Sequence, residues 1–161
     1  MKARDIMTHP VRTVREDCTL EDAARAMLDH NIGALPVTNS EGKLTGILTE
    51  SDFAAKEKGI PFTLYSFPQV FGEWLPKQGV ELMYAAARSR RVSDFMSRAA
   101  ECLDPADEIE AVITKMLKTR FHRLPVVDEG FPVGIIARHD LLRLMVANCG
   151  KHLNLVEGDR P

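Results

Sequence analysis

GILTESD at residues 46–52 returns later in the chain as GIIARHD at residues 134–140. Two shorter stretches repeat as well: DIMT at 5–8 returns as DFMS at 94–97, and LPVT at 35–38 returns as LPVV at 124–127. The offset is 89 for the shorter stretches and 88 for the longer one, so the second copy lacks one loop residue. Two copies of one supersecondary unit usually pack together, because each covers apolar surface that the other leaves exposed. A cleft between the two halves is therefore the expected place for a ligand.

The periodicity of apolar residues predicts one helix in each copy, from about 19 to 30 and from about 107 to 119. Thr19 is expected to cap the first helix. The spacing i, i+3, i+4, i+7, i+8 places the apolar residues on one helical face. These residues match in phase: Leu20, Ala23, Ala24, Met27 and Leu28 in the first copy, and Ile109, Val112, Ile113, Met116 and Leu117 in the second.

Short strands and a second helix complete each copy. Alternating apolar residues predict a small strand at 11–14 before the first helix. The strands predicted after the helices form a hairpin in each copy, at 34–38 with 43–48 and at 123–127 with 132–137. Further helices are expected at about 51–58 and 139–148. The order strand, helix, strand, strand, helix predicts an α/β (α+β) fold built from two β-α-β-β-α units.

These patterns divide the chain into four segments. The repeats are expected at 1–58 and 91–149, with an insert at 59–90 between them and a polar tail at 150–161. The region between the copies holds six of the ten aromatic residues, which is unlike a flexible linker. We expect helices near 68–75 and 77–90 that pack onto the repeats or across a dimer contact. A separate ligand pocket in the insert is the alternative.

Composition excludes several classes of protein. The chain has 21 basic and 23 acidic residues, whereas surfaces that coat nucleic acid are strongly basic, so nucleic acid is not expected as the main partner. Apolar runs are far shorter than a membrane span, and the N-terminus resembles no signal peptide. Three widely spaced cysteines fit reduced thiols in a cytoplasmic protein. Redox sensing by one of them is an alternative.

Motifs of catalysis and metal binding are absent from the sequence. It contains no Gly-x-Ser-x-Gly, no P-loop, no Cys-x-x-Cys and no His-Glu-x-x-His. The five histidines show no spacing typical of metal ligands. The sequence therefore predicts no catalytic residue and no metal site, and an enzyme is not expected.

The repeated motifs together resemble a tandem pair of CBS (cystathionine-β-synthase) domains, also called a Bateman module. The resemblance rests on Asp-x-Met-[Thr/Ser], an amphipathic helix, a Pro-Val strand and Gly-x-x-Thr-x-x-Asp, and it covers nearly all of 1–58 and 90–149. It implies two units related by a pseudo-twofold axis, with their sheets packed together. It also implies clefts for adenosine-containing ligands such as AMP, ADP, ATP or S-adenosylmethionine. Such modules commonly form homodimers and regulate enzymes or transporters.

Thr49 and Asp52 are the candidate ribose-binding residues of the first copy. A carboxylate can accept hydrogen bonds from two neighbouring ribose hydroxyls, and a threonine hydroxyl can donate and accept. Both residues fall where a strand meets a helix, so backbone N–H groups lie nearby for a phosphate. The alternative is that Thr49 only caps the helix and Asp52 sits in its first turn. In the second copy Ala137 replaces the threonine, while Asp140 remains.

Cationic residues distinguish the second copy. FHRLPV at 121–126 resembles the His-Arg-Leu-Pro-Val segment of AMP-activated protein kinase gamma subunits, which implies that His122 and Arg123 hold phosphate. Their equivalents in the first copy, Gly33 and Ala34, carry no charge. Arg138 adds a further cation near Asp140. The alternative for each arginine is a surface ion pair, and for His122 a hydrogen-bonded strand residue.

The Pro-Val strands have two expected roles. Pro36, Val37, Pro125 and Val126 are first of all core residues. The resemblance implies that the same strands also wall an apolar slot for adenine.

The expected function is a regulatory module that senses an adenine nucleotide or related adenosyl ligand and acts on a partner protein. The alternative is a ligand-free dimerisation scaffold that has kept the fold and lost its sites. A homodimer is expected because the apolar helix faces need covering. The hydroxyl of Thr49 further suggests that the Asp52 cleft binds adenosyl ligands more tightly than the Asp140 cleft.

Overall fold

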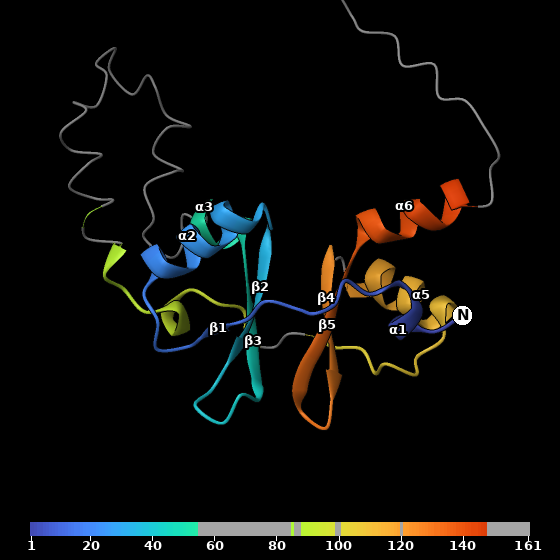
Figure 1. Cartoon of the computed structure of the whole chain (residues 1–161), viewed down its shortest axis with the longest axis horizontal. Helices are drawn as coiled ribbons and strands as arrows, with labels where there is room; N and C mark the ends of the chain where they lie inside the picture. Colours follow the sequence, from blue (N-terminus) through green and yellow to red (C-terminus); the bar gives the residue numbers. More distant parts are fainter. Residues whose placement is uncertain (55–84, 86–87, 99–100, 120, 148–161) are drawn as a thin grey trace, which may run out of the picture.

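The computed structural model describes residues 1–54, 85, 88–98, 101–119 and 121–147. The helices expected at 68–75 and 77–90 fall wholly or largely outside these residues, and the tail at 150–161 falls outside them altogether. Two small sheets stand side by side at the centre, with helices on their outer sides (Figure 1). The expected mixed α+β fold is confirmed.

The first repeat contains β1 (Val14–Arg15), α2 (Leu20–His30), β2 (Ala34–Thr38), β3 (Leu44–Thr49) and α3 (Glu50–Ala54). β1 pairs parallel with β2, and β2 pairs antiparallel with β3, in a three-stranded sheet. The predicted order of elements is therefore confirmed in this repeat.

The second repeat contains α5 (Ile109–Thr119), β4 (Arg123–Asp128), β5 (Phe131–Ala137) and α6 (Arg138–Ala147). β4 and β5 form an antiparallel hairpin. A single parallel bridge from Leu103 to Val126 stands where the first repeat has β1. The second repeat thus keeps the first strand only as one bridge.

The strand predicted at 11–14 is wrong in extent. The strand covers only Val14–Arg15, where Val14 pairs with Val37 of β2. The preceding residues have no strand partner because the chain is still crossing from one repeat to the other, and Val11 and Arg12 line a cavity.

α2 begins with the predicted cap. The Thr19 hydroxyl accepts from the backbone N–H of Asp22 at 3.1 Å, and the Asp22 carboxylate accepts from the Thr19 hydroxyl at 2.7 Å and from its N–H at 3.3 Å. The hydrogen bonds from Thr19 lower the pKa of Asp22. This reciprocal arrangement is a capping box, which satisfies backbone donors at the start of the helix.

The apolar stripes of α2 and α5 are only partly buried. Leu20, Ala23 and Met27 of α2 face the core of the first repeat. Leu28 and its counterpart Leu117 are 81% and 70% exposed. Only part of each predicted five-residue face is therefore buried. The residues at its centre pack on the sheet, and the leucine at its edge faces away from the described part of the chain.

The N-terminal segments of the two repeats, called their lead-ins below, are exchanged: each packs on the other repeat. α1 (Ala3–Ile6) comes first in the sequence but lies beside α5, where Ala3 is completely buried in the core of the second repeat (Figure 1). η3 (Val92–Asp94), followed by Phe95 and Met96, packs into the core of the first repeat. Each hydrophobic core is thus completed by residues from the lead-in of the other repeat.

Backbone hydrogen bonds hold each exchanged segment on the other repeat, and the two sets of bonds are related by pseudo-twofold symmetry. Thr8 and Ile135 exchange two bonds of 2.9 and 3.2 Å, and Ser97 and Ile47 exchange two of 2.9 and 3.1 Å. The four residues are equivalent under the offsets of the sequence repeat. The two repeats therefore hold each other in one unit.

The repeated glycines of β3 and β5 are explained by this packing. A Cβ on Gly46 would lie 2.7 Å from the Ser97 carbonyl oxygen and 3.0 Å from the Met96 sulfur. A Cβ on Gly134 would overlap the sulfur of Met7. Close approach of the methionines of the Asp-x-Met motifs, rather than of a ligand, is what these glycines allow in this structure.

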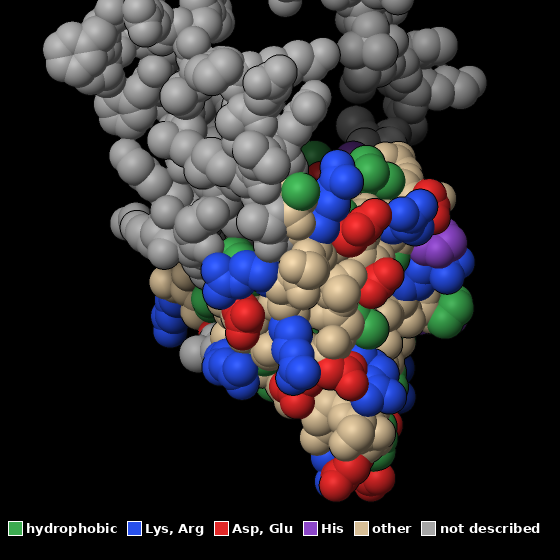
Figure 2. Space-filling model, turned by 90° about the vertical axis from the view of Figure 1, so that its left-hand side faces the viewer, with side chains coloured by type: hydrophobic (Ala, Val, Ile, Leu, Met, Phe, Trp, Pro, Cys, Tyr) green, Lys and Arg blue, Asp and Glu red, His purple; other side chains and the backbone are tan. Residues whose placement is uncertain are grey.

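The outer surface carries charges of both signs. On the face formed by the first repeat, basic and acidic side chains are interspersed (Figure 2). This agrees with the small net charge of −2. Within the described residues, no helix has the length and apolar character needed to span a membrane.

Candidate functional site

A cavity of about 350 Å³ lies between the two repeats and is called the Asp140 cleft below. Its walls come from the chain before β1, the end of α2 and start of β2, Arg123 of β4, and the corner between β5 and α6. Apolar side chains and polar groups both contribute to it, and its size is that of pockets for small organic ligands. The apolar side of the lining includes Val11, Ile32, Ala34 and Ile135.

Asp140 supplies the buried carboxylate of this cleft, and the residue is 6% exposed. Its Oδ2 accepts from the Ala137 backbone N–H at 2.8 Å, while Oδ1 lies 3.4 Å from Nη1 of the exposed Arg143. These contacts fix the carboxylate at the start of α6. A carboxylate has about four acceptor positions, so Asp140 can accept further bonds from hydroxyl groups.

Arg123 extends from the second repeat to the first. Its Nη2 lies 3.5 Å from Oε2 of Glu50, the first residue of α3. Both side chains lie against Gly33, where a Cβ would overlap them. Gly33 thus leaves space for an ion pair between the repeats at the edge of the Asp140 cleft.

Thr49 and Asp52 lie together at the equivalent corner of the first repeat. Asp52 is 8% exposed, and its Oδ2 accepts from the Thr49 N–H at 2.8 Å and from the Thr49 hydroxyl at 3.0 Å. The hydroxyl that the sequence offers for a ligand therefore donates to the neighbouring carboxylate. Neither residue lines the Asp140 cleft.

The remaining predicted site residues lie outside the lining of the Asp140 cleft. His122 and Arg138 are exposed, and they are joined by a backbone hydrogen bond of 2.9 Å. Pro36, Val37 and Val126 are buried strand residues, as the core assignment predicted. Of the predicted set, Arg123 and Asp140 are the two that the structure brings into this cleft.

Several cleft residues were missed by the sequence analysis. They are Thr8, Arg12, His30 and His139. Thr8 belongs to the first repeated motif, but only the exchange of lead-ins places it beside β5. His139 lies inside the repeated GIIARHD stretch, directly before Asp140, so the sequence motif could have identified it as a cleft residue.

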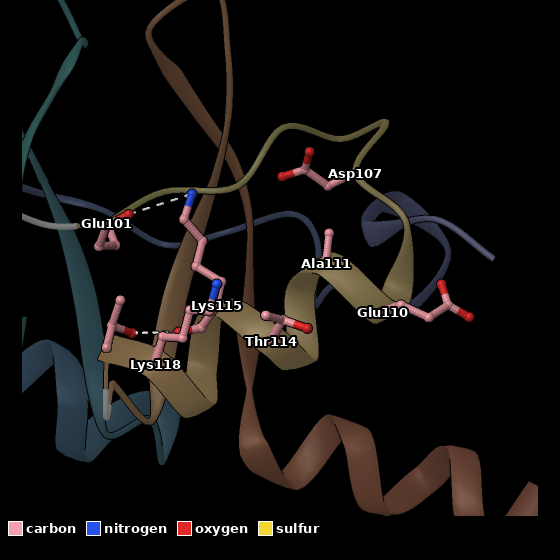
Figure 3. Close-up of a pocket in the computed structure, with 8 residues that line it drawn as sticks. Glu101, Asp107, Glu110, Ala111, Thr114, Lys115 and Lys118 are labelled. Atoms are coloured by element: carbon pink, nitrogen blue, oxygen red, sulfur yellow. Dashed lines mark hydrogen bonds and ion pairs between the residues drawn. The ribbon is translucent and has the colours of Figure 1, made fainter.

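A second, larger hollow of about 590 Å³ lies along the outer side of α5 (Figure 3). Lys115 donates to the Cys102 carbonyl at 2.6 Å and pairs with Glu101 at 3.5 Å. Asp107 and Glu110 point in different directions at its far end (Figure 3). This hollow contains none of the predicted site residues, and a single helix forms most of it, so the Asp140 cleft is the stronger candidate.

No metal site accompanies either cavity in the described part of the chain. These residues contain no group of three His, Cys, Asp or Glu side chains that could hold a metal ion.

Solved structures resemble the whole fold. The CBS domain of a membrane protein from Sphaerobacter thermophilus is 40% identical, with a TM-score of 0.73, over 89% of this chain and 87% of that one. The CBS domain pair of protein MJ0100, solved with 5′-methylthioadenosine and S-adenosyl-L-methionine, is 25% identical with a TM-score of 0.68. That match covers 92% of this chain and 98% of the other.

Relatives found by sequence support the same fold family. An uncharacterised protein of Methanocaldococcus jannaschii is 31% identical over 157 residues, which cover 91% of this chain and 92% of the relative. The chain spans smaller shares of two other curated relatives, 42% of a second M. jannaschii protein and 58% of the chloroplast protein CBSX1 of Arabidopsis thaliana. Residues 3–59 and 92–147 each match the CBS domain family. The chain therefore belongs to the CBS domain family and contains a tandem pair of these domains.

Proposed function

We propose that the chain is a regulatory module that binds an adenosine-containing ligand between its two repeats. The observation that carries this proposal is the Asp140 cleft, where a buried carboxylate faces a cavity with an apolar wall. Asp140 would accept from ribose hydroxyls, and the apolar lining would pack against the flat base. The MJ0100 domain pair, which binds adenosyl compounds, supports this class of ligand.

The first repeat would provide a related second site. Thr49 and Asp52 occupy the positions equivalent to Ala137 and Asp140, and Asp52 is similarly buried. His122, Arg123 and Arg138 remain candidates for phosphate, and Pro36, Val37 and Val126 for the walls around adenine. AMP, ADP, ATP and S-adenosylmethionine are the ligands to be compared.

The output of such a module is a change in a partner protein rather than a reaction. Ligand binding can shift only an equilibrium between states that bind the ligand differently. A ligand between two repeats contacts both, and is thus placed to change how they sit against each other. We therefore propose a cytoplasmic regulator without catalytic activity.

A thermal-shift titration tests ligand binding. A ligand that binds only the native state stabilises it by about 2.7 kcal/mol at one hundred times its dissociation constant. At least one of AMP, ADP, ATP and S-adenosylmethionine should raise the melting temperature of the native chain. Asp140→Ala should reduce that shift, whereas Asp17→Ala, which removes a surface carboxylate paired with Arg15, should leave it unchanged.

A ligand-free scaffold is the second candidate. The observation that favours it is that Oδ2 of Asp52 accepts both the Thr49 N–H and the Thr49 hydroxyl, so the hydroxyl proton is already used within the corner. If none of the four ligands changes the melting temperature at millimolar concentration, the scaffold replaces the sensor.

We also propose that the chain forms a homodimer through its helices. Leu28 and Leu117 occupy equivalent places on α2 and α5, and Leu142 of α6 is 54% exposed. Large apolar side chains at repeated positions favour a protein contact. Light scattering should give twice the 18.0 kDa chain mass. Leu117→Glu should shift the native chain toward monomer, whereas Lys118→Glu on the same helix should not.

A further inference from the structure

Arginines gather on the lead-in of the second repeat. Arg88, Arg90, Arg91 and Arg98 are all exposed, whereas the stretch from 88 to 98 carries one acidic residue, Asp94. The exchange of lead-ins places this stretch on the outer side of the first repeat (Figure 1). The four arginines therefore belong to the surface of the first repeat.

Arg15 joins these arginines in one surface, called the Arg91 surface below. The backbone N–H of Ser93 donates to the Glu16 carbonyl at 3.0 Å, so the lead-in runs beside the end of β1. Nη2 of Arg98 donates to the Ser93 carbonyl at 3.2 Å, which holds that side chain on the same stretch. No part of this surface lines the Asp140 cleft. It consists of Arg15, Arg88, Arg90, Arg91 and Arg98.

Buried residues beneath the Arg91 surface hold it in place. Val92 is completely buried and Phe95 is 1% exposed, so the short η3 helix is anchored in the core of the first repeat. The guanidinium of Arg90 lies 4.8 Å from the centre of the Phe95 ring. Planar guanidinium groups on an anchored backbone lose little freedom when they bind a partner.

Carboxylates neutralise only part of the charge on this surface. Arg15 pairs with Asp17 at 2.7 Å, and Arg90 pairs with Asp94 at 3.6 Å. The pKa of Asp17 is lowered, mainly by its hydrogen bond with Arg15 and to a smaller extent by the charge of Arg91. Within the described residues, the three other arginines form no ion pair with a carboxylate. The surface therefore carries an excess of positive charge on a chain whose net charge is −2.

The equivalent surface of the second repeat shows that the fold does not require these arginines. The repeat offset relates Arg15 to Asp104 and Arg98 to His9. Both lead-ins pack on the opposite repeat with equivalent backbone hydrogen bonds. Because the same packing forms with a different set of charges, the arginines are available for a role outside the fold.

We propose that the Arg91 surface docks an acidic segment of the regulated partner protein. Guanidinium groups match carboxylates in geometry and charge, and arginine is enriched in protein interfaces. Asp17 and Asp94 lie among the arginines, so carboxylates spaced along a peptide fit this surface better than the continuous charge of a nucleic acid. The inference rests on the proposed function in one respect, because it names the kind of partner on which the regulator acts.

Fluorescence anisotropy on the full chain tests this docking. The probe is a fluorescein-labelled peptide of repeated Glu-Gly-Ser units, and the same peptide with Lys in place of Glu should not bind. Binding should weaken strongly between about 0.05 and about 0.5 M salt, because salt screens exposed charges. The double variant Arg88→Gln with Arg91→Gln should weaken binding by about fivefold to thirtyfold. Lys2→Gln with Arg4→Gln, the same change in charge on the other lead-in, is the matched control and should change the affinity by less than about twofold.

Asp17→Asn provides a test of opposite sign that a misfolded variant cannot imitate. It releases Arg15 from its ion pair, so peptide binding should tighten by up to about threefold. No binding by the native chain, or an equal loss in both double variants, would overturn the proposal. Tighter binding of a single-stranded oligonucleotide or of phosphatidylserine vesicles than of the peptide would also overturn it.

The thermal shift separates this inference from the proposed function. If an adenosyl ligand raises the melting temperature and the peptide does not bind, the docking surface alone is wrong. If the peptide binds and none of the four ligands raises the melting temperature, ligand sensing alone is wrong.

Discussion

The corners between strand and helix in the two repeats share a backbone arrangement, and one of their differences is the residue that ends the strand, Thr49 in the first repeat and Ala137 in the second. In each, the aspartate Oδ2 accepts a backbone N–H at 2.8 Å, from Thr49 to Asp52 and from Ala137 to Asp140. In the first repeat the carboxylate also accepts the Thr49 hydroxyl at 3.0 Å. A hydroxyl beside a carboxylate can thus donate to that carboxylate, so its presence alone does not identify the tighter site.

The surroundings of the two corners differ more than the corners themselves. Arg12 lines the Asp140 cleft, whereas its counterpart Glu101 pairs with Lys115 on the outer side of α5. Arg123 lies at the edge of the same cleft, and its counterpart Ala34 has no charge. Ligand preference is therefore expected to follow these surrounding charges.

The first comparison concerns the glycines beside the exchanged methionines. Gly46→Ala should destabilise the protein by about 3 kcal/mol, because its Cβ would meet a backbone carbonyl that cannot move away cheaply. Gly134→Ala should cost about 1 kcal/mol, because the obstructing group is the flexible Met7 side chain. Urea unfolding of both variants measures the difference. An equal or reversed order would show that the two lead-ins are not packed as described.

The second comparison removes the two aspartates in turn. Asp140→Ala should weaken AMP binding by about tenfold to a hundredfold, since a buried ribose hydroxyl would lose its partner. Asp52→Ala should weaken it by less than about threefold, although it loses the same backbone hydrogen bond. Because both variants lose an equivalent hydrogen bond, a difference in AMP affinity between them cannot come from that loss of stability alone. A larger loss for Asp52→Ala would restore the order expected from the Thr49 hydroxyl.

The third comparison concerns the starts of the two long helices. Thr19→Ala should cost about 1 kcal/mol, because it removes the capping box of α2. Glu108→Ala, at the equivalent place before α5, should cost less than about 0.5 kcal/mol, since its carboxylate makes an exposed ion pair with the Met1 ammonium. Chemical denaturation at neutral pH gives both values.

The same cap has a defined pH dependence. The pKa of Asp22 is lowered in the folded protein, so its contribution is complete above the ordinary carboxyl pKa and is lost as the pH falls through the lowered value. The difference between the native chain and Thr19→Ala should therefore shrink in acid. A difference that stays constant down to about pH 2 would contradict this role of Asp22.

The smallest effect is expected from Ala137→Thr, which makes the second corner resemble the first. The added hydroxyl should donate to Asp140, as Thr49 donates to Asp52, and AMP affinity should change by less than about threefold. Titration calorimetry measures this. A tenfold gain would show that the hydroxyl contacts the ligand directly, as the sequence analysis expected.

Much of the fold could be predicted because its signals are local. The helix predicted at about 19–30 is α2 (Leu20–His30), and the strand predicted at 34–38 is β2 (Ala34–Thr38). Helical periodicity and turn residues report such elements within a few residues. The resemblance to CBS domain pairs also implied that the two halves are related by a pseudo-twofold axis.

The exchange of lead-ins could not be predicted from these signals. The Asp-x-Met motif at 5–8 adjoins the first repeat in sequence, so nothing local indicates that Met7 packs against Gly134. The lining of the Asp140 cleft was likewise predictable only where a local motif marks the residue. Arg123 and Asp140 belong to recognisable sequence motifs. Arg12 does not, and it lines the cleft only because the chain crosses from one repeat to the other there.

A crystal structure of the native chain with AMP would show which corner binds the ligand. We expect AMP in the Asp140 cleft, with a ribose hydroxyl on the Asp140 carboxylate and the phosphate on the Arg123 guanidinium. AMP bound only beside Thr49 and Asp52 would contradict this.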